Sequence, residues 1–176
     1  MLNKDYEIVV DNIVTYMNKI NKITGSNFKP FNYYGDDKAT DIIIAMGSVS
    51  DTIRETVDYP NKKGKKYGMV EVHLYRPFSV KHLLSVLPGT VKNVAVLDRT
   101  KDAAADGEPL YLDVSSALRY KNIKVIGGRY GLSSKDTTPA QIKSVFDFMH
   151  SKSVHHNFTI GINDDVTNLS LDIDDD

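Results

Sequence analysis

The chain alternates between short apolar runs and amphipathic segments from residue 41 onward, and this alternation constrains its fold most strongly. Residues 41–46 include a continuous apolar run, which is typical of a strand buried on both faces of a parallel sheet. Further strands are expected at residues 67–74, 91–97 and 123–126, and helices at residues 51–61, 79–87, 108–120 and from Pro139 onward. Because parallel strands need crossover connections, this order predicts an α/β domain with helices on both faces of its sheet.

The segments that flank this alternation have different patterns. Residues 6–23 carry apolar side chains at helical spacing and precede Gly25, so residues 1–27 are expected to form a connector helix outside the domain. A helical tail used for oligomerisation is the less favoured alternative. Residues 28–34 carry four aromatic side chains around Pro30, which favours a packed edge strand over an aromatic platform for a ligand.

These patterns divide the chain into three parts. Residues 1–27 form the connector helix, residues 28–150 form one α/β domain, and residues 151–176 are interpreted as a linker into a following domain. The linker contains a short apolar run at residues 158–162 for which the sequence offers no partner strand. We therefore expect the chain to be a piece of a longer protein.

Composition excludes several kinds of chemistry. The 176 residues carry a net charge of −1, which argues against a nucleic-acid partner. No cysteine is present, so the chain has no thiol nucleophile and no cysteine ligand for a cluster or zinc ion. No apolar run approaches the ~20 residues that span a bilayer, and the first residues lack the apolar core of a signal peptide. A cytoplasmic protein without a membrane partner is expected, and the histidines show no metal-ligand spacing.

Cationic residues follow three of the four predicted parallel strands. Arg76 follows the second strand, Arg99 and Lys101 the third, and Arg129 and Lys135 the fourth. Because the carboxyl ends of parallel strands meet at one edge of a sheet, these side chains are expected to lie near one another. The candidate residues for a domain interface or an anion site are Arg76, Asp98, Arg99, Lys101, Gly128, Arg129, Gly131 and Lys135. An ion-paired interface is favoured over a bound anion, and the amino ends, such as residues 62–66 and 121–122, are interpreted as solvated turns.

The glycine-rich stretch at residues 127–139 runs from the last parallel strand into a helix. Thr138 is the expected N-cap and Pro139 the first helical residue. Glycines permit close approach of a partner, and the free N–H groups of a helix start attract anions. No complete phosphate loop, dinucleotide fingerprint or nucleophile elbow is present, so no catalytic residue is assigned. A stand-alone module that binds an anion or nucleotide through Arg129, Lys135 and this helix start stays as the alternative.

Six stretches together resemble the second domain of pyruvate:ferredoxin (flavodoxin) oxidoreductases. They are YG at 34–35, IAMGS at 44–48, LYRPF at 74–78, VLDRTK at 96–101, GEPLYLDV at 107–114 and GGRYGLSSKDTTP at 127–139. The resemblance spans roughly residues 6–170. Residues 159–171 resemble the passage of that family into its third domain.

The resemblance implies a fold like the transketolase C-terminal domain. This is a three-layer α/β/α sandwich with a five-stranded, mostly parallel sheet and one antiparallel edge strand, here within residues 31–34. It also implies the reaction of the parent enzyme, in which pyruvate and coenzyme A give acetyl-CoA on thiamine diphosphate. Electrons then pass through [4Fe-4S] clusters to ferredoxin or flavodoxin.

In that family other domains hold thiamine diphosphate, Mg²⁺ and the clusters, so no cofactor is expected to bind this chain. The resemblance therefore implies a structural and interface domain, inactive alone, within a homodimer of the parent enzyme. The cationic edge would dock neighbouring domains of the same polypeptide. The same domain of a related 2-oxoacid oxidoreductase is a further alternative.

Overall fold

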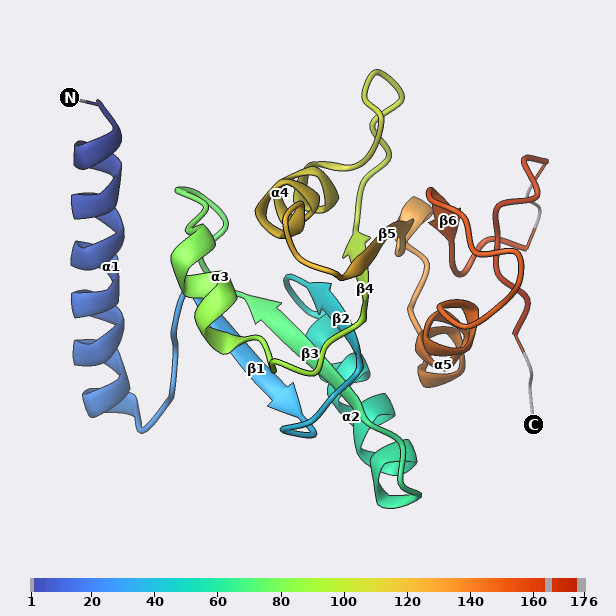
Figure 1. Ribbon diagram of the computed structural model, residues 1–176, viewed down its shortest axis with the longest axis horizontal. Helices are drawn as coiled ribbons and strands as arrows, with labels where there is room; N and C mark the ends of the chain where they lie inside the picture. Colours follow the sequence, from blue (N-terminus) through green and yellow to red (C-terminus); the bar gives the residue numbers. More distant parts are fainter. Residues whose placement is uncertain (1, 164–165, 174–176) are drawn as a thin grey trace.

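A six-stranded sheet forms the centre of the computed structural model, which describes residues 2–163 and 166–173 (Figure 1). The strands are β1 (Phe31–Gly35), β2 (Asp41–Ala45), β3 (Tyr67–Val72), β4 (Asn93–Asp98), β5 (Lys124–Arg129) and β6 (Phe158–Thr159). The helices are α1 (Leu2–Thr24), α2 (Val49–Lys62), α3 (Val80–Val86), α4 (Pro109–Leu118) and α5 (Pro139–Phe148), with a short 3₁₀ turn at Leu132–Ser134.

The spatial order of the strands is β1-β3-β2-β4-β5-β6, and only β1 among them runs antiparallel to its neighbour. Phe31 of β1 lies opposite Val72 of β3. Pro30 stands just before β1, where its carbonyl oxygen accepts the N–H groups of His73 and Leu74. The predicted mostly parallel sheet with one antiparallel edge is thus confirmed, and proline occupies the edge position that it tolerates.

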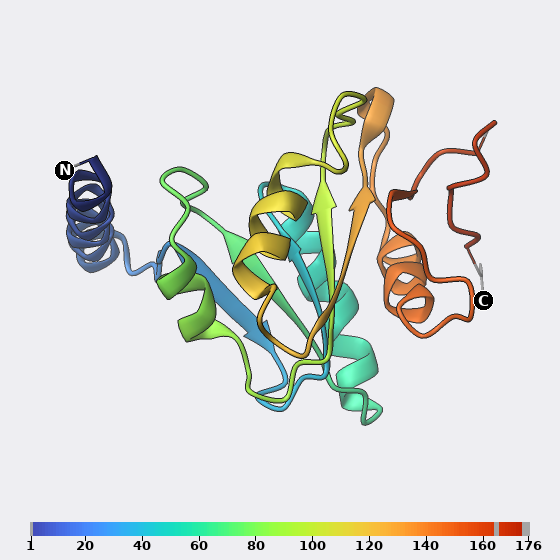
Figure 2. The ribbon, with the colours of Figure 1, turned by 45° about the horizontal axis from the view of Figure 1, so that its top comes forward.

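Two apolar layers cover the sheet, one on each face. Ile43 packs with side chains of α2 and α5, whereas Ile42 and Ile44 pack with side chains of α3 and α4. Successive residues of a strand point to opposite faces, so a continuous apolar run supplies both layers. Figure 2 shows α3 and α4 in front of the sheet and α2 behind it, which gives the predicted three-layer sandwich.

The number of strands and the fate of the segment after residue 150 differ from the prediction. The sheet has six strands rather than five, because Phe158 and Thr159 pair in parallel with Gly128 and Arg129 of β5. The expectation that residues 158–162 lack a partner in the chain is therefore wrong. Phe158 and Ile160 are fully buried in the layer beneath α5. The acidic residues at 164–165 and 174–176 lie outside the described residues.

Helix α1 stands beside the sandwich rather than within it (Figures 1 and 2). Gly25 follows it with a φ of +71° and donates its N–H to the carbonyl of Asn21, as expected for a helix stop. Val10 is buried against the segment that enters α3, but Tyr16 and Ile23 are 63% and 84% exposed. The helix thus joins the domain by one stripe and leaves further apolar side chains in solvent.

Candidate functional site

The carboxyl ends of β4 and β5 form the centre of the candidate site. Asp98, the last residue of β4, lies opposite Arg129, the last residue of β5, and Leu97 lies opposite Gly128. The loop that follows β4 leads into α4, and the loop that follows β5 leads through the 3₁₀ turn into α5. The sheet therefore brings the predicted residues of two different loops to one edge.

The Asp98 side chain is directed into the protein rather than outward. Its two carboxylate oxygens accept the backbone N–H groups of Leu110 and Tyr111, at 3.0 and 3.1 Å, in the first turn of α4. Burial raises the pKa of Asp98 above its ordinary value, the two backbone hydrogen bonds oppose this shift, and the nearby Glu108 and Asp113 carboxylates add to it. Asp98 thus anchors α4 to the end of β4.

Arg129 forms a buried ion pair with Glu108. Its Nε lies 2.5 Å from Oε1 of Glu108, and the two side chains are only 8% and 1% exposed. Nη1 of Arg129 also donates, at 3.4 Å, to the carbonyl oxygen of Asn157, just before β6. The other carboxylate oxygen of Glu108 has no hydrogen-bond partner among the described atoms. Arg129 therefore links the start of α4 to β5 and β6, and its charge is already matched inside the chain.

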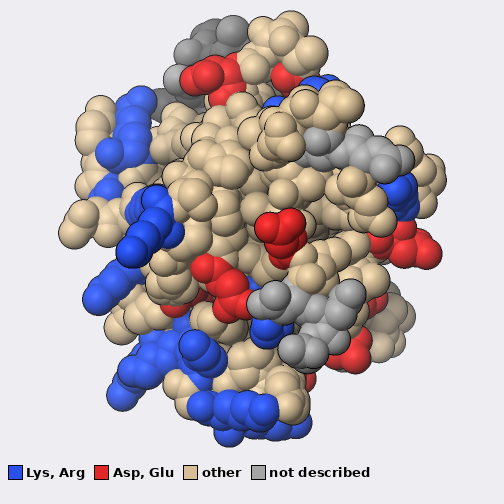
Figure 3. Space-filling view, turned by 90° about the vertical axis from the view of Figure 1, so that its right-hand side faces the viewer, with Lys and Arg blue, Asp and Glu red and all other residues tan. Residues whose placement is uncertain are grey.

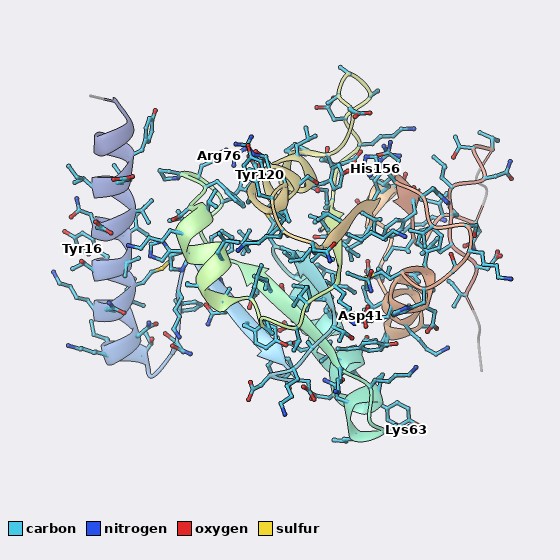
Figure 4. All side chains as sticks on the ribbon, in the orientation of Figure 1. Tyr16, Asp41, Lys63, Arg76, Tyr120 and His156 are labelled. Atoms are coloured by element: carbon cyan, nitrogen blue, oxygen red, sulfur yellow. The ribbon has the colours of Figure 1, made fainter. Side chains whose placement is uncertain are left out.

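Arg76 is also paired within the chain, at the surface of the edge (Figure 4). Its guanidinium lies 3.9 Å from the ring centre of Tyr75 and donates to the Tyr75 hydroxyl at 2.9 Å. It forms an ion pair with Asp113 of α4 at 2.7 Å, while its side chain stays 54% exposed. Stacking and pairing hold this cation in a defined position where a partner can reach it.

The outward-facing cations of the edge are Arg99, Lys101 and Lys135. All three are exposed, and none of them has an ion-pair partner in residues 6–163 or 166–173. Gly131 adopts a φ of +61°, and a Cβ placed there would lie 3.0 Å from Nε of Arg99. Glycine at this position lets the Arg99 side chain lie across the loop after β5. The predicted set thus divides into buried, internally paired residues and exposed, unpaired cations.

The remaining glycines of the stretch make room for side chains of the chain itself. A Cβ on Gly128 would overlap the ring of Phe158, and a Cβ on Gly127 would overlap the stacked rings of Tyr111 and His156. His156, labelled in Figure 4, accepts the N–H of Gly127 at Nδ1, at 3.2 Å. The rings thus fill the space beside these glycines that a bound anion would need.

The start of α5 has the predicted cap. Thr138 accepts the N–H of Gln141, and the Gln141 side chain accepts the N–H of Thr138, which forms a reciprocal capping box before Pro139. One of the N–H groups that would attract an anion is therefore occupied. Together with the internal pairing of Arg129, this disfavours the alternative of an anion site at this helix start.

Sequence reasoning did not identify Glu108 as the partner of Arg129. The two residues are 21 positions apart in the sequence, which exceeds any local spacing rule. The available signal was a lone acidic residue before Pro109 in an otherwise apolar helix start. Such a residue needs a cation when the helix start is buried.

Figure 3 shows the face that carries α5 and the C-terminal segment. Its basic side chains gather at the lower end and the left margin, and a few acidic side chains lie near its centre. Within the part of the chain that the structure describes, no group of three or more histidine or acidic side chains could hold a metal ion. No helix in this part is long and apolar enough to cross a membrane.

One solved structure shares this architecture. The 2-oxoglutarate:ferredoxin oxidoreductase from Magnetococcus marinus superimposes with a TM-score of 0.50, covering 75% of this chain and 21% of that chain. The two sequences are 20% identical, so this likeness concerns the fold alone.

The sequence itself identifies the family. The model of the family described as "Pyruvate:ferredoxin oxidoreductase core domain II" matches residues 39–142, so the chain belongs to this family. The pyruvate-flavodoxin oxidoreductase of Enterobacter agglomerans is 49% identical over 98% of the chain and 15% of its own length. A Nostoc pyruvate-flavodoxin oxidoreductase is 47% identical over 97% of the chain and 43% of its own length. The pyruvate:ferredoxin oxidoreductase of Moorella thermoacetica is 47% identical over 92% of the chain and 14% of its own length.

The resemblance seen in the sequence is thus confirmed. The chain spans between 14% and 43% of the length of these three relatives. It corresponds to one domain of a family of longer oxidoreductases.

Proposed function

We propose that this chain is a structural and interface domain of a pyruvate:ferredoxin or pyruvate:flavodoxin oxidoreductase. The observation that carries the proposal is the alignment with the Enterobacter agglomerans relative, which covers 98% of the chain but 15% of the relative. In the proposal, a chain with this coverage is one domain of a longer polypeptide. In the proposal, the exposed cations of the carboxyl edge contact a neighbouring domain.

The reaction belongs to the whole parent protein. The proposal is that pyruvate is oxidatively decarboxylated and its acetyl group is transferred to coenzyme A, with ferredoxin or flavodoxin as the electron acceptor. Thiamine diphosphate with Mg²⁺ would supply the carbanion chemistry, and [4Fe-4S] clusters would carry the electrons. This chain has no cysteine to ligate a cluster, so other domains would hold these groups. A parent homodimer in the cytoplasm is part of the same proposal.

The internal contacts of the edge support an interface role. Asp98 fixes the start of α4, and the pair between Arg129 and Glu108 ties α4 to β5 and β6. The backbone that carries Arg99 and Lys135 is therefore anchored at both ends of each loop. An anchored backbone loses little further freedom when the cations that it carries meet carboxylates of a partner, which favours a stable interface.

Charge reversal of Arg99→Glu together with Lys135→Glu in the full-length parent tests the proposal. We expect a lower melting temperature and partial dissociation of the domain in limited proteolysis, with turnover largely retained by the intact fraction. Lys65→Glu, an exposed lysine far from this edge, is the matched control. An unchanged melting temperature with a collapse of kcat would show that the edge serves chemistry rather than docking.

The isolated chain gives a second test. Mixed with pyruvate, thiamine diphosphate, Mg²⁺ and coenzyme A, it should not reduce a viologen dye. Dye reduction by this chain alone would refute the assignment of a non-catalytic domain.

A further inference from the structure

A hollow of about 710 Å³ lies at the end of the sheet opposite the docking edge. Figure 2 shows the loops after α3 and α4 reaching this end, where β4 and β5 begin. Four lysines line the hollow: Lys38, Lys66, Lys92 and Lys121. Its volume falls within the range of about 300–1,000 Å³ that small-molecule sites occupy.

The sheet fixes the positions of these lysines. The N–H of Thr40 donates to the carbonyl oxygen of Lys66 at 3.0 Å, and the N–H of Lys92 donates to the carbonyl oxygen of Thr40 at 2.8 Å. Lys66, Thr40 and Lys92 therefore stand in one row across three neighbouring strands. Because neighbouring strands lie about 4.8 Å apart, the backbones of the two lysines are separated by roughly 10 Å.

The positive charge of the hollow is not neutralised by the chain. None of the four lysines has an ion-pair partner within the described residues, and no acidic residue lines the hollow. Asp41 is the buried carboxylate at this end of the sheet, and its oxygens already contact Thr40, Asn93 and His150. All four lysines are exposed, so solvent weakens their mutual repulsion, but an anion between them would be attracted by all four.

The other wall of the hollow is apolar. Leu84 and Leu87 come from the end of α3, and Leu118 and Ile123 come from the end of α4 and the turn after it. The hydroxyl of Thr90 is held by the carbonyl oxygen of Ala39 at 2.8 Å, so the rim between the two walls is ordered. A ligand that fits both walls has an anionic end and an apolar body.

We propose that this hollow binds a small molecule that carries two or more phosphate groups on a flat apolar body. The row of lysines supplies compact ammonium charges for the phosphates, and the leucines supply a surface for the ring. The site lies at the opposite end of the strands from the docking edge, so it goes beyond the proposed interface function. Its failure would leave that function untouched.

Calorimetric titration of the chain with three probes tests the proposal. ADP offers both phosphates and a ring, inorganic pyrophosphate offers the charge alone, and adenosine offers the ring alone. We expect ADP to bind more tightly than pyrophosphate, adenosine to bind far more weakly than either, and the affinity of both anions to fall as salt is raised.

A pair of substitutions then locates the site. The double variant Lys92→Gln with Lys121→Gln should bind ADP about tenfold or more weakly, since each substitution removes a charge-assisted contact. Lys65→Gln with Lys124→Gln is the control, because these lysines are exposed at the same end of the sheet but do not line the hollow. It should leave ADP affinity within about twofold.

Three outcomes would overturn the proposal. They are the absence of saturable binding up to roughly millimolar ADP, equal weakening by the two pairs of substitutions, and adenosine binding as tightly as ADP. A fall in melting temperature in Lys92→Gln with Lys121→Gln, without any rise on adding ADP to the unsubstituted chain, would also overturn it. The lysines would then serve only to stabilise the carboxyl ends of the helices.

Discussion

Replacing Arg129 by methionine would leave the Glu108 carboxylate buried without its cation. The two side chains are 8% and 1% exposed, and their closest atoms lie 2.5 Å apart. Methionine keeps much of the volume of the arginine stem, so the change removes charge and hydrogen bonds more than packing. Glu108 already has one oxygen without a hydrogen-bond partner in the described structure, so no local group is placed to compensate.

We expect a large loss of stability in this variant, because no cation offsets the removal of the Glu108 carboxylate from water. At an effective dielectric constant of about 20, two unit charges at 2.5 Å attract by about 7 kcal/mol, most of which compensates for their removal from water. Breaking one side of such a pair typically costs about 3–5 kcal/mol. Arg129→Met should therefore lower the free energy of unfolding by about that amount. Adding Glu108→Gln removes the buried charge and should recover about half of the loss.

Urea unfolding of the four proteins, followed by circular dichroism, measures this double-mutant cycle. The exposed Arg99→Met is the control and should change stability by less than about 0.5 kcal/mol. If Arg129→Met were as mild as Arg99→Met, or if the two substitutions at 108 and 129 were additive, the buried pair would not hold α4 to the sheet.

Three further predictions test other features. Gly128→Ala should lower stability by about 1–3 kcal/mol in urea unfolding, because its Cβ would overlap the ring of Phe158. The control is Gly89→Ala, whose Cβ would meet no atom within 4 Å and which should be nearly neutral. Equal effects of the two substitutions would contradict the close packing at Gly128. Because burial raises the pKa of Asp98 above its ordinary value of 3.8, the folded protein holds this proton more tightly than the unfolded chain does. The free energy of unfolding of the natural protein, compared with that of Asp98→Asn, should thus fall as pH rises from 3.8 to the folded-state pKa of Asp98, and then level off. If unfolding experiments showed that this difference rises over the same pH interval, the burial effect would be contradicted. Ile23→Lys, at a side chain that is 84% exposed, should change the free energy of unfolding by less than about 0.5 kcal/mol in urea unfolding. A loss of more than about 1 kcal/mol would contradict the exposure of this side chain.

The central sheet was predictable because its residues follow rules that act locally. The apolar run of β2 supplies both layers of the core, so its sequence alone indicates a doubly covered strand. Pro30 indicates the edge position of β1, and Thr138 with Pro139 indicates the start of α5. Each of these signals lies within a few residues of the structure that it specifies.

The features that sequence reasoning missed depend on contacts between distant segments. Strand β6 is two residues long and pairs with a strand about thirty residues earlier, so it carries no usable periodicity of its own. The partner of Arg129 lies in another loop, and the internal pairing of this arginine was not predicted. Lys66 and Lys121 stand in separate turns that were interpreted as ordinary solvated turns. Only the folded sheet brings them to the same hollow.

The contact between Gly128 and Phe158 has a consequence for how such domains diverge. The glycine leaves no space for a side chain, and the ring fills the space completely. Each residue therefore limits the size of the other, although they lie on different strands. Across homologous domains the two positions should vary together, so that a larger residue at 128 accompanies a smaller one at 158. A single substitution at either position would pass through a poorly packed intermediate, which makes this pair slow to change.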